Sequence, residues 1–281
     1  MDKTDILAVV VSFNGGKKTL ETIDRLKGHV GRIQIVDNAS SNEDITLLKT
    51  VVDNKKVFFT QFYENKGIGV ALNHGIDVAR ENGFDWLLTM DQDSLVSEFF
   101  IDNYCLALNE NSNLVCLTPN ISINGLKSEL EDSFVDYAIT SGNLVRMNVF
   151  DDIGPYNEEL FIDCIDFDFS LRLRNAGHKI KRIESSLMVH ELGEARKLPK
   201  IVGRFYVRHS PVRRYYMFRN LLYMIEMHSF KFPFFIAKLL VTHVILFIFI
   251  PFYDKHPLVS FKFVFQGLRD YFFRRMGVYS N

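Results

Sequence analysis

The stretch Trp86-Leu87-Leu88-Thr89-Met90-Asp91-Gln92-Asp93-Ser94 decides the fold class of this chain. Its apolar half predicts a buried strand of an α/β sheet, because strands covered on both faces consist of continuous apolar runs. Asp91 and Asp93 then emerge at the carboxyl end of the strand, where open α/β sheets bind ligands. Two such close carboxylates repel each other, so the pattern favours a divalent cation that carries a diphosphate. An Asp-rich turn that caps a following helix is the alternative interpretation.

Apolar runs and helix-forming segments alternate through residues 1–95. Strands are expected at 6–13, 32–37, 57–62 and 86–90, and helices at 17–26, 44–52 and 68–80. Such short spacing predicts βαβ units and a mostly parallel sheet. Further along, helices are expected at 97–109 and 166–174, and strands at 114–118, 179–184 and 187–190. The predicted fold class is therefore α/β.

Composition narrows the class of protein. Of 281 residues, 47% are hydrophobic and 14% aromatic, with 26 phenylalanines, which is rich for a soluble enzyme. The three cysteines, Cys105, Cys116 and Cys164, are too few and oddly numbered for a disulfide scaffold, which indicates a reducing compartment. Residues 1–13 lack the long apolar core of a signal peptide, so we expect a cytoplasmic protein.

Charge divides the chain into two parts. Residues 1–195 carry 18 basic and 31 acidic side chains, a net charge of −13, whereas residues 196–281 carry 15 and 3, a net charge of +12. We expect a catalytic domain over residues 1–200 and a basic, aromatic helical region over 201–281. Basic residues interleaved with apolar runs favour contact with anionic membrane lipid over contact with nucleic acid.

The most apolar segment, residues 232–252, is interrupted by two prolines, a lysine and a histidine: Pro233, Pro251, Lys238 and His243. A helix that spans a bilayer needs about 20 mostly apolar residues, so this segment is at the limit. The amphipathic stretch 261–275 that follows fits insertion into one face of the membrane better. A buried core helix or a dimer interface is the alternative, which leaves a homo-oligomer open.

Residues 208–220 carry four arginines among aromatic residues: Arg208, Arg213, Arg214 and Arg219. Guanidinium groups match phosphate oxygens with two parallel hydrogen bonds, which would suit a lipid diphosphate or a phospholipid headgroup. A solvated basic helix face, packed through its tyrosines and phenylalanines, explains the same pattern.

Glycine-rich phosphate loops are absent from the sequence. Gly67-x-Gly69 opens a predicted helix, but the sixth position is Leu72, so the dinucleotide-binding pattern fails, and no P-loop pattern occurs. A bound diphosphate would then depend on a metal ion. Asp37, at the end of the second predicted strand, is placed to contact a base or ribose, with an Asx turn as the alternative.

Two further positions are candidates for chemistry. Asp163, Asp166 and Asp168 form an acidic cluster at the start of a predicted helix, and Asp166 is the best placed general base. Ordinary acidic charge at a helix N-terminus is the alternative. His190 ends a predicted strand and could complete a site of mixed oxygen and nitrogen ligands for Mn²⁺ or Mg²⁺, or it could be an interior histidine.

Taken together, these stretches resemble an inverting family 2 glycosyltransferase with the GT-A fold, within the bacterial rhamnosyltransferase branch. The matching stretches cover residues 6–220 in the expected order: Val9-Val-Val-Ser-Phe-Asn14, Val36-Asp-Asn-Ala-Ser40, Glu64-Asn-Lys-Gly-Ile68, Asn73-His-Gly75, Met90-Asp-Gln-Asp-Ser94, Ser141-Gly-Asn143, residues 160–172, His190-Glu-Leu-Gly193 and residues 209–220. The branch often has Glu-Trp after the base, where this chain has Asp168-Phe169, so the contacts of that pair are not carried over.

The resemblance implies a role for each matching residue. The donor-binding set is Ser12, Asn14, Asp37, Asn38, Asn65, Gly67, Asn73, Asp91 and Gln92, and the last two shape the sugar pocket. Asp93 and His190 hold the divalent cation, and Asp166 deprotonates the acceptor hydroxyl. The acceptor side is expected to comprise Ser141, Gly142, Asp163, Arg213 and Arg214. Residues 1–95 form the nucleotide-sugar half and residues 96–200 the acceptor half.

The resemblance further implies transfer of L-rhamnose from dTDP-β-L-rhamnose to a lipid-linked saccharide in the synthesis of a bacterial surface polysaccharide. The enzyme is expected at the cytoplasmic face of the membrane. Two alternatives stay open. One is a UDP-sugar-dependent transferase of the same fold, such as a galactofuranosyl- or glucosyltransferase, and the other is a catalytically silent membrane scaffold.

Overall fold

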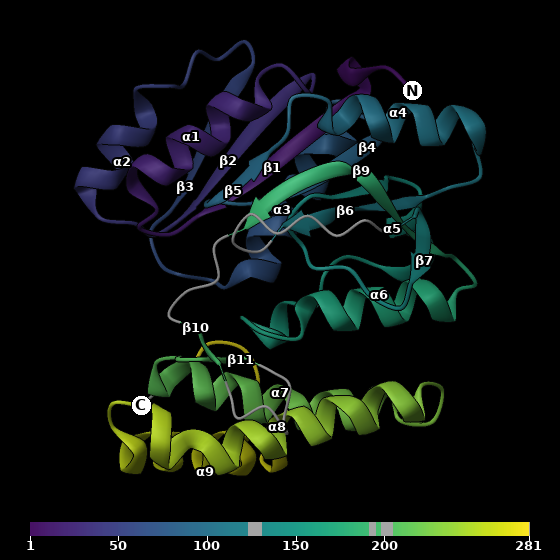
Figure 1. Cartoon of the computed structure of the whole chain (residues 1–281). Coiled ribbons are helices and arrows are strands. Elements are labelled where there is room, and N and C mark those ends of the chain that lie inside the picture. The colour runs from purple at the N-terminus through teal and green to yellow at the C-terminus, as the bar shows by residue number, and fades with distance from the viewer. Residues whose placement is uncertain (123–130, 191–194, 198–204, 281) are drawn as a thin grey trace.

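The computed structural model describes residues 1–122, 131–190, 195–197 and 205–280. Its centre is a nine-stranded sheet in the order β3-β2-β1-β4-β8-β6-β9-β5, with β7 also paired to β9 (Figure 1). The strands are β1 (Ile6–Ser12), β2 (Arg32–Asn38), β3 (Val57–Phe62), β4 (Trp86–Asp91), β5 (Ser94–Val96), β6 (Cys116–Ser122), β7 (Ser133–Val135), β8 (Asn143–Arg146) and β9 (Ile180–His190). A separate antiparallel pair joins β10 (Ala195–Lys197) and β11 (Phe205–Val207).

The predicted parallel half is confirmed. Strands β1 to β4 run parallel, and the pairing places Ser12 beside Asp37 and Val11 beside Asp91. The carboxyl ends of β1, β2 and β4 therefore meet at one edge of the sheet. From β8 onward the sheet becomes mixed, because β8 runs antiparallel to both β4 and β6.

Helices cover both faces of the sheet. Alternate residues of β1 divide between two cores, since successive side chains of a strand point to opposite faces. Ile6, Ala8 and Val10 pack with α1 (Gly16–Leu26), α2 (Asn42–Lys49) and α4 (Phe100–Glu110). Leu7 and Val9 pack in a core with α3 (Ile68–Glu81), α5 (Val149–Ile153) and α6 (Ile165–Asn175). Two short 3₁₀ helices cover Lys3–Asp5 and Glu158–Leu160.

Two predicted boundaries differ from the structure. The strands predicted at 179–184 and 187–190 are one strand, β9, whose pairing with β6 shifts register between Pro119 and Asn120. Such an irregularity lets the strand continue through polar residues that interrupt the apolar pattern. Helix α4 begins at Phe100 rather than at residue 97.

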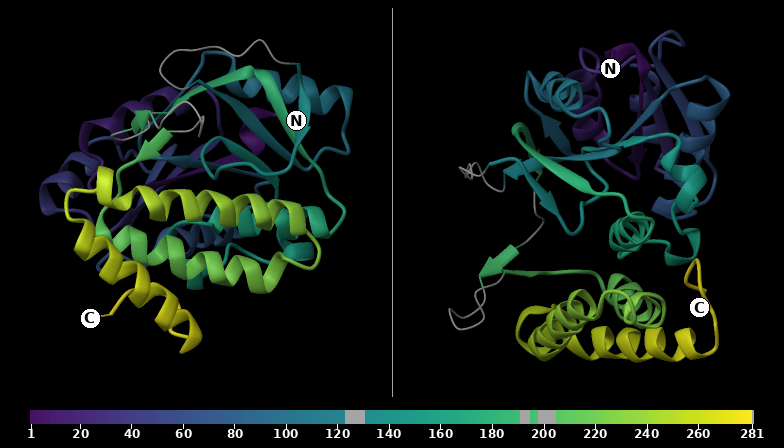
Figure 2. Two further views of the ribbon diagram at one scale, coloured as in Figure 1. Left: turned by 60° about the horizontal axis from the view of Figure 1, so that its bottom comes forward. Right: turned by 90° about the vertical axis from the view of Figure 1, so that its right-hand side faces the viewer.

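The C-terminal region forms a helical layer below α6, made of α7 (Pro211–His228), α8 (Pro233–Tyr253) and α9 (Pro257–Phe272) (Figures 1 and 2). Each helix begins with a proline, which lacks the N–H that the first helical turn leaves unpaired. The apolar core on the α6 side of the sheet extends to Leu221 of α7 and Leu239 of α8. The layer therefore packs on the α/β part.

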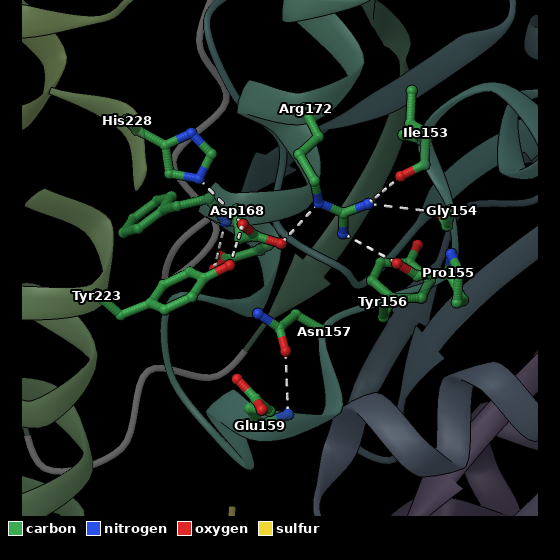
Figure 3. A network of polar contacts seen from close by, with 12 residues as sticks. Ile153, Gly154, Pro155, Tyr156, Asn157, Glu159, Asp168, Arg172, Tyr223 and His228 are labelled. Carbon is green, nitrogen blue, oxygen red and sulfur yellow. Dashed lines mark hydrogen bonds and ion pairs between the residues drawn. The ribbon is translucent and has the colours of Figure 1, made fainter. Parts of the chain in front are cut away.

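Asp168 makes one of the polar connections between these two parts (Figure 3). Its side chain is buried and accepts hydrogen bonds from Nε of Arg172 at 2.8 Å and from the hydroxyl of Tyr223 at 3.4 Å, and it lies 3.0 Å from Nε2 of His228. Burial alone would raise the pKa of Asp168, but the bonds to His228 and Arg172 outweigh it and lower that pKa. The carboxylate on α6 is thus ionised and joined to α7.

Helix α8 keeps a largely exposed apolar surface. Among the described residues it is the one helix long and apolar enough to cross a membrane, a test of length and composition that core helices of soluble proteins also pass. Only 22% of its most apolar stretch is buried. The exposed side chains include Phe234, Val241, Val244 and Ile248, which recur at helical spacing on one side.

The substitution Asp168→Ala should lower the free energy of unfolding by about 3 kcal/mol, because His228 and Arg172 would lose a buried carboxylate partner. Urea denaturation followed by circular dichroism measures this change. The matched control is Asp152→Ala, which removes the exposed pair of Asp152 with His178 and should have little effect. Equal effects of the two substitutions would contradict the assigned role of Asp168.

Candidate active site

The carboxyl edge of β1 and β2 carries two buried oxygens that lack partners. Within the described part of the chain, Oγ of Ser12 and Oδ1 of Asp37 make no hydrogen bond, although both side chains are fully buried. The other oxygen of Asp37 accepts the backbone N–H of Ser40 at 3.0 Å. An unpaired buried polar atom costs free energy, so this edge is suited to a ligand that supplies the missing bonds.

Four asparagines that were predicted to bind the donor hold the surrounding loops. Oδ1 of Asn14 accepts the backbone N–H of Ser41, and Oδ1 of Asn65 accepts the backbone N–H of Gly67. The amide of Asn38 accepts the N–H of Lys66 and donates to the carbonyl of Gly67. The amide of Asn73 bonds both backbone groups of Tyr156. Gly67 has a φ of +90°, and a Cβ there would lie 2.7 Å from the carbonyl of Phe161. These residues shape the walls of the edge.

The side chains of Asp91 and Gln92, at the end of β4, point in different directions. Asp91 lines a cavity, and its backbone N–H donates to Oγ of Ser141. Gln92 turns toward β1, where its amide bonds both backbone groups of Phe13, at 2.7 and 3.2 Å. Ser141 and Gly142 are buried behind Asp91, and their neighbours Ile139 and Thr140 line the cavity instead.

The pairing of β5 with β9 brings Asp93 and His190, the two residues predicted to bind metal, to neighbouring strand ends. Asp93 immediately precedes β5, whose Ser94 pairs with His190 at the end of β9. The side chain of His190 lies outside the described residues. Within the described residues, no three His, Cys, Asp or Glu side chains form a group that could hold a metal ion. Protein sites for Mg²⁺ often supply only one or two carboxylates, with substrate phosphates and water completing the shell. The carboxylates at the end of β4 fit that requirement.

The cavity has a volume of about 950 Å³ and extends from Asp91 past the start of α6 to α8. The segment that enters α6 is strained, since Phe161, Asp163 and Cys164 have φ values of 62°, 63° and 65°. Such conformations persist only when the surroundings hold them, and they cluster at active sites. Nδ2 of Asn220, on α7, bonds the carbonyls of Leu160, Ile162 and Asp163 and holds this segment in place.

Asn220 was not among the predicted site residues. It stands within the 209–220 stretch, but one asparagine among arginines and aromatic residues gives no sign of its partners 57 to 60 positions earlier.

The two predicted acceptor arginines point to different places. Arg213 makes a two-pronged contact with the carboxylate of Asp163, with its closest bond at 2.9 Å, and both residues line the cavity. Arg214 is 0% exposed and pairs with Asp254 at 3.0 Å inside the helical layer. The structure therefore brings Arg213 to the site and leaves Arg214 as a buried structural cation.

Asp166 lines the cavity from the first turn of α6. Burial, aided by the nearby charges of Asp163 and Asp91, raises its pKa from 3.8 to about 7, against the opposing bond from the N–H of Phe167. A general base is most effective with a pKa near the working pH. Asp166 is thus a carboxylate able to accept a proton near neutrality.

Comparison with known proteins assigns the family. The model of Glycosyl transferase family 2 matches residues 7–154. The chain belongs to this family. It is 34% identical over 240 residues to the dTDP-rhamnosyl transferase RfbF of Shigella flexneri, covering 77% of this chain and 78% of that protein. The protein is therefore a glycosyltransferase of the bacterial family 2 type, which confirms the predicted class of enzyme.

Solved structures confirm the GT-A fold of this family 2 chain. The structure of S. aureus TarS 1–349 in complex with UDP-GlcNAc superposes with a TM-score of 0.64 at 14% identity, over 95% of this chain and 80% of that one. GalNAc-T7 with UDP, GalNAc and Mn²⁺ superposes with a TM-score of 0.57 at 15% identity, over 66% and 43%.

The transferase activity should rise with pH through an apparent pKa of about 7 in kcat/KM. Asp166 accepts a proton only when ionised, so a pKa raised to about 7 removes active base as the pH falls below that value. Steady-state kinetics with a nucleotide-sugar donor across this range measures the profile. Donor affinity over the same range is the control and should not share the inflection. A flat profile would exclude Asp166 as the base.

Proposed function

We propose that this glycosyltransferase moves L-rhamnose, with inversion, from dTDP-β-L-rhamnose to a hydroxyl of a saccharide acceptor. The observation that carries the proposal is the 34% identity to a dTDP-rhamnosyl transferase over most of both chains. The unpaired oxygens of Ser12 and Asp37 support a nucleoside at the edge of β1 and β2. Asp91 then borders the sugar, and Gln92 shapes its pocket by holding Phe13. Asn38, Asn65, Gly67 and Asn73 keep the edge in shape.

Inversion follows from a single displacement. The carboxylate of Asp166 takes the proton of the acceptor hydroxyl while that oxygen forms a bond to the anomeric carbon. On the opposite side, the bond between the anomeric carbon and the diphosphate oxygen breaks, and dTDP leaves with the electron pair. Asp163, fixed by Arg213, is placed to orient the acceptor beside Asp166.

A divalent cation fits the donor side. Asp93 and the imidazole of His190 would hold Mn²⁺ or Mg²⁺, while Asp91 at the same strand end would face the sugar. The ion would supply positive charge to the departing diphosphate. With no glycine-rich phosphate loop in the sequence, this charge is the counterpart that the diphosphate needs.

The acceptor is proposed to be linked to a lipid at the cytoplasmic face of the membrane. The cavity that holds Asp166 is walled on its far side by Phe232, Phe235, Leu239 and Leu246 of the α8 region. The same helix exposes apolar side chains outward, and the basic residues of the C-terminal region suit anionic lipid. An acceptor held in the bilayer could thus enter the cavity beside α8.

A donor panel tests the proposed chemistry. Wild-type protein should release dTDP from dTDP-rhamnose in preference to UDP from UDP-glucose, UDP-galactofuranose or UDP-N-acetylglucosamine, as followed by chromatography of the nucleotide products. Asp166→Asn should bind dTDP-rhamnose with unchanged affinity but lose at least about a hundredfold in transfer, since general-base catalysis contributes that much. Preferred release of UDP would replace the proposed donor, and full turnover by Asp166→Asn would remove the proposed base.

Removal of the cation tests the metal proposal. EDTA should abolish transfer by the wild-type protein, and Mn²⁺ or Mg²⁺ should restore it. Asp93→Ala should weaken the apparent affinity for Mn²⁺ at least about tenfold, since it removes a carboxylate ligand. Asp152→Ala, at an exposed carboxylate away from the cavity, is the control. Undiminished activity in EDTA would show that the diphosphate leaves without a cation.

A further inference from the structure

The cavity changes character along its length. Asp91, Asp163 and Asp166 line it near the start of α6, Arg174 and Lys231 line it near the end of α6, where Arg174 stacks on Phe232, and Lys238 lines it from the second turn of α8. Asp166 and Arg174 both belong to α6 and are eight residues apart, which corresponds to about 12 Å at the helical rise. The proposed reaction therefore takes place at an acidic end, and a basic end lies a short distance away along the same helix.

The basic end carries positive charge that the described residues do not neutralise. Arg174 pairs with Asp136 at 2.9 Å and stacks over the ring of Phe232 at 4.9 Å, so its charge is matched. The ammonium groups of Lys231 and Lys238 make no hydrogen bond or ion pair with any residue in the described part of the chain, and both side chains are exposed. Two positive charges thus remain available to a ligand.

Aromatic rings line the cavity beside Asp166. The rings of Tyr137, Phe167 and Phe235 meet edge to face, with centroids 4.9, 5.6 and 5.8 Å apart, and all three line the cavity. These aromatic surfaces can pack against the apolar faces of sugar rings without demanding hydrogen bonds. Saccharide can therefore occupy the length between Asp166 and the lysines.

Exposed phenylalanines accompany the lysines. Phe230 precedes Lys231 and is 95% exposed, and Phe234 follows Lys231 by three residues and is 91% exposed. Fully exposed phenylalanines next to lysines are typical of segments that enter the headgroup region of a membrane. Along α6 from Asp166 to Arg174, the cavity thus presents carboxylates, aromatic rings, the ammonium group of Lys231 and the exposed Phe230.

We propose that Lys231 and Lys238 form a subsite for the phosphate or diphosphate that joins the acceptor saccharide to its lipid. This order of groups matches an amphiphile with sugar at one end, phosphate in the middle and hydrocarbon at the other end. Two unmatched lysines suit a diphosphate, and Arg174 backs the subsite through its stacking on Phe232. The inference rests on the proposed lipid-linked acceptor and assigns its phosphate to named residues.

Farnesyl diphosphate is a soluble probe for this subsite. The double substitution Lys231→Gln and Lys238→Gln should weaken its binding at least about tenfold by isothermal titration calorimetry, because two charge-assisted contacts are lost. The double substitution Lys255→Gln and Lys262→Gln removes the same charge from exposed lysines that do not line the cavity, and it should leave the affinity unchanged. Farnesol should bind both doubly substituted proteins and the wild type equally weakly.

Vesicles separate an acceptor phosphate from a phospholipid headgroup. Co-sedimentation with vesicles of phosphatidylglycerol should fall to a similar extent for both double substitutions, because general attraction to an anionic surface depends on total charge. If the cavity lysines affect vesicle binding alone and leave farnesyl diphosphate binding intact, they contact headgroups only and the subsite is refuted. Equal loss of farnesyl diphosphate binding in the control pair would refute it as well.

Binding of dTDP-rhamnose to the same proteins keeps this test separate from the donor proposal. Its affinity should be unaffected by either double substitution, since neither lysine belongs to the proposed donor site at the edge of β1, β2 and β4. A wild-type protein that fails to bind dTDP-rhamnose but binds farnesyl diphosphate through Lys231 and Lys238 would overturn the donor and retain the subsite.

Discussion

Repulsion among the carboxylates at one end of the cavity is the constraint on which the site depends. Asp91, Asp163 and Asp166 line the same space, and each charge must be offset if the others are to ionise. Arg213 matches Asp163, and burial, aided by the charges of Asp163 and Asp91, raises the pKa of Asp166 to about 7. The proposed cation would add positive charge at the end of β4, where Asp91 and Asp93 lie. A carboxylate with a pKa raised in this way would suit the proposed uptake of the acceptor proton.

The C-terminal helical layer supplies positive charge and hydrogen-bond donors to the acidic α/β part. The net charges of −13 and +12 on the two parts of the chain meet at this boundary, where Arg213 reaches Asp163 and Asn220 holds the strained segment before α6. The boundary between two domains near residue 200 is a proposal. The contacts that cross it include those of Arg213 and Asn220, which hold the segment before Asp166. Removal of the layer would therefore disturb the catalytic residues as well as any contact with membrane.

The sequence was informative where chemistry follows from local pattern. The apolar run before Asp91 predicted a strand end correctly, and the acidic start of α6 predicted the position of Asp166. It was uninformative where a side chain finds its partner far along the chain. Arg213 and Arg214 are neighbours of the same type, yet one faces the cavity and the other is buried against Asp254. Helical rotation between adjacent residues decides this, and only the packing of α7 fixes that rotation.

Asp168-Phe169 stands where the rhamnosyltransferase branch often has Glu-Trp, and the packing of α6 explains how this chain accommodates the difference. Phe169 is buried and stacks on Tyr156 with centroids 4.5 Å apart, and Asp168 faces Arg172 and His228 rather than the cavity. Both side chains therefore act on how α6 packs against α5 and α7, and neither touches the space around Asp166. A change at these positions must be accommodated by α7, whose His228 and Tyr223 contact the shorter carboxylate. The pair can thus differ from the rhamnosyltransferase pattern while the base and its surroundings stay the same.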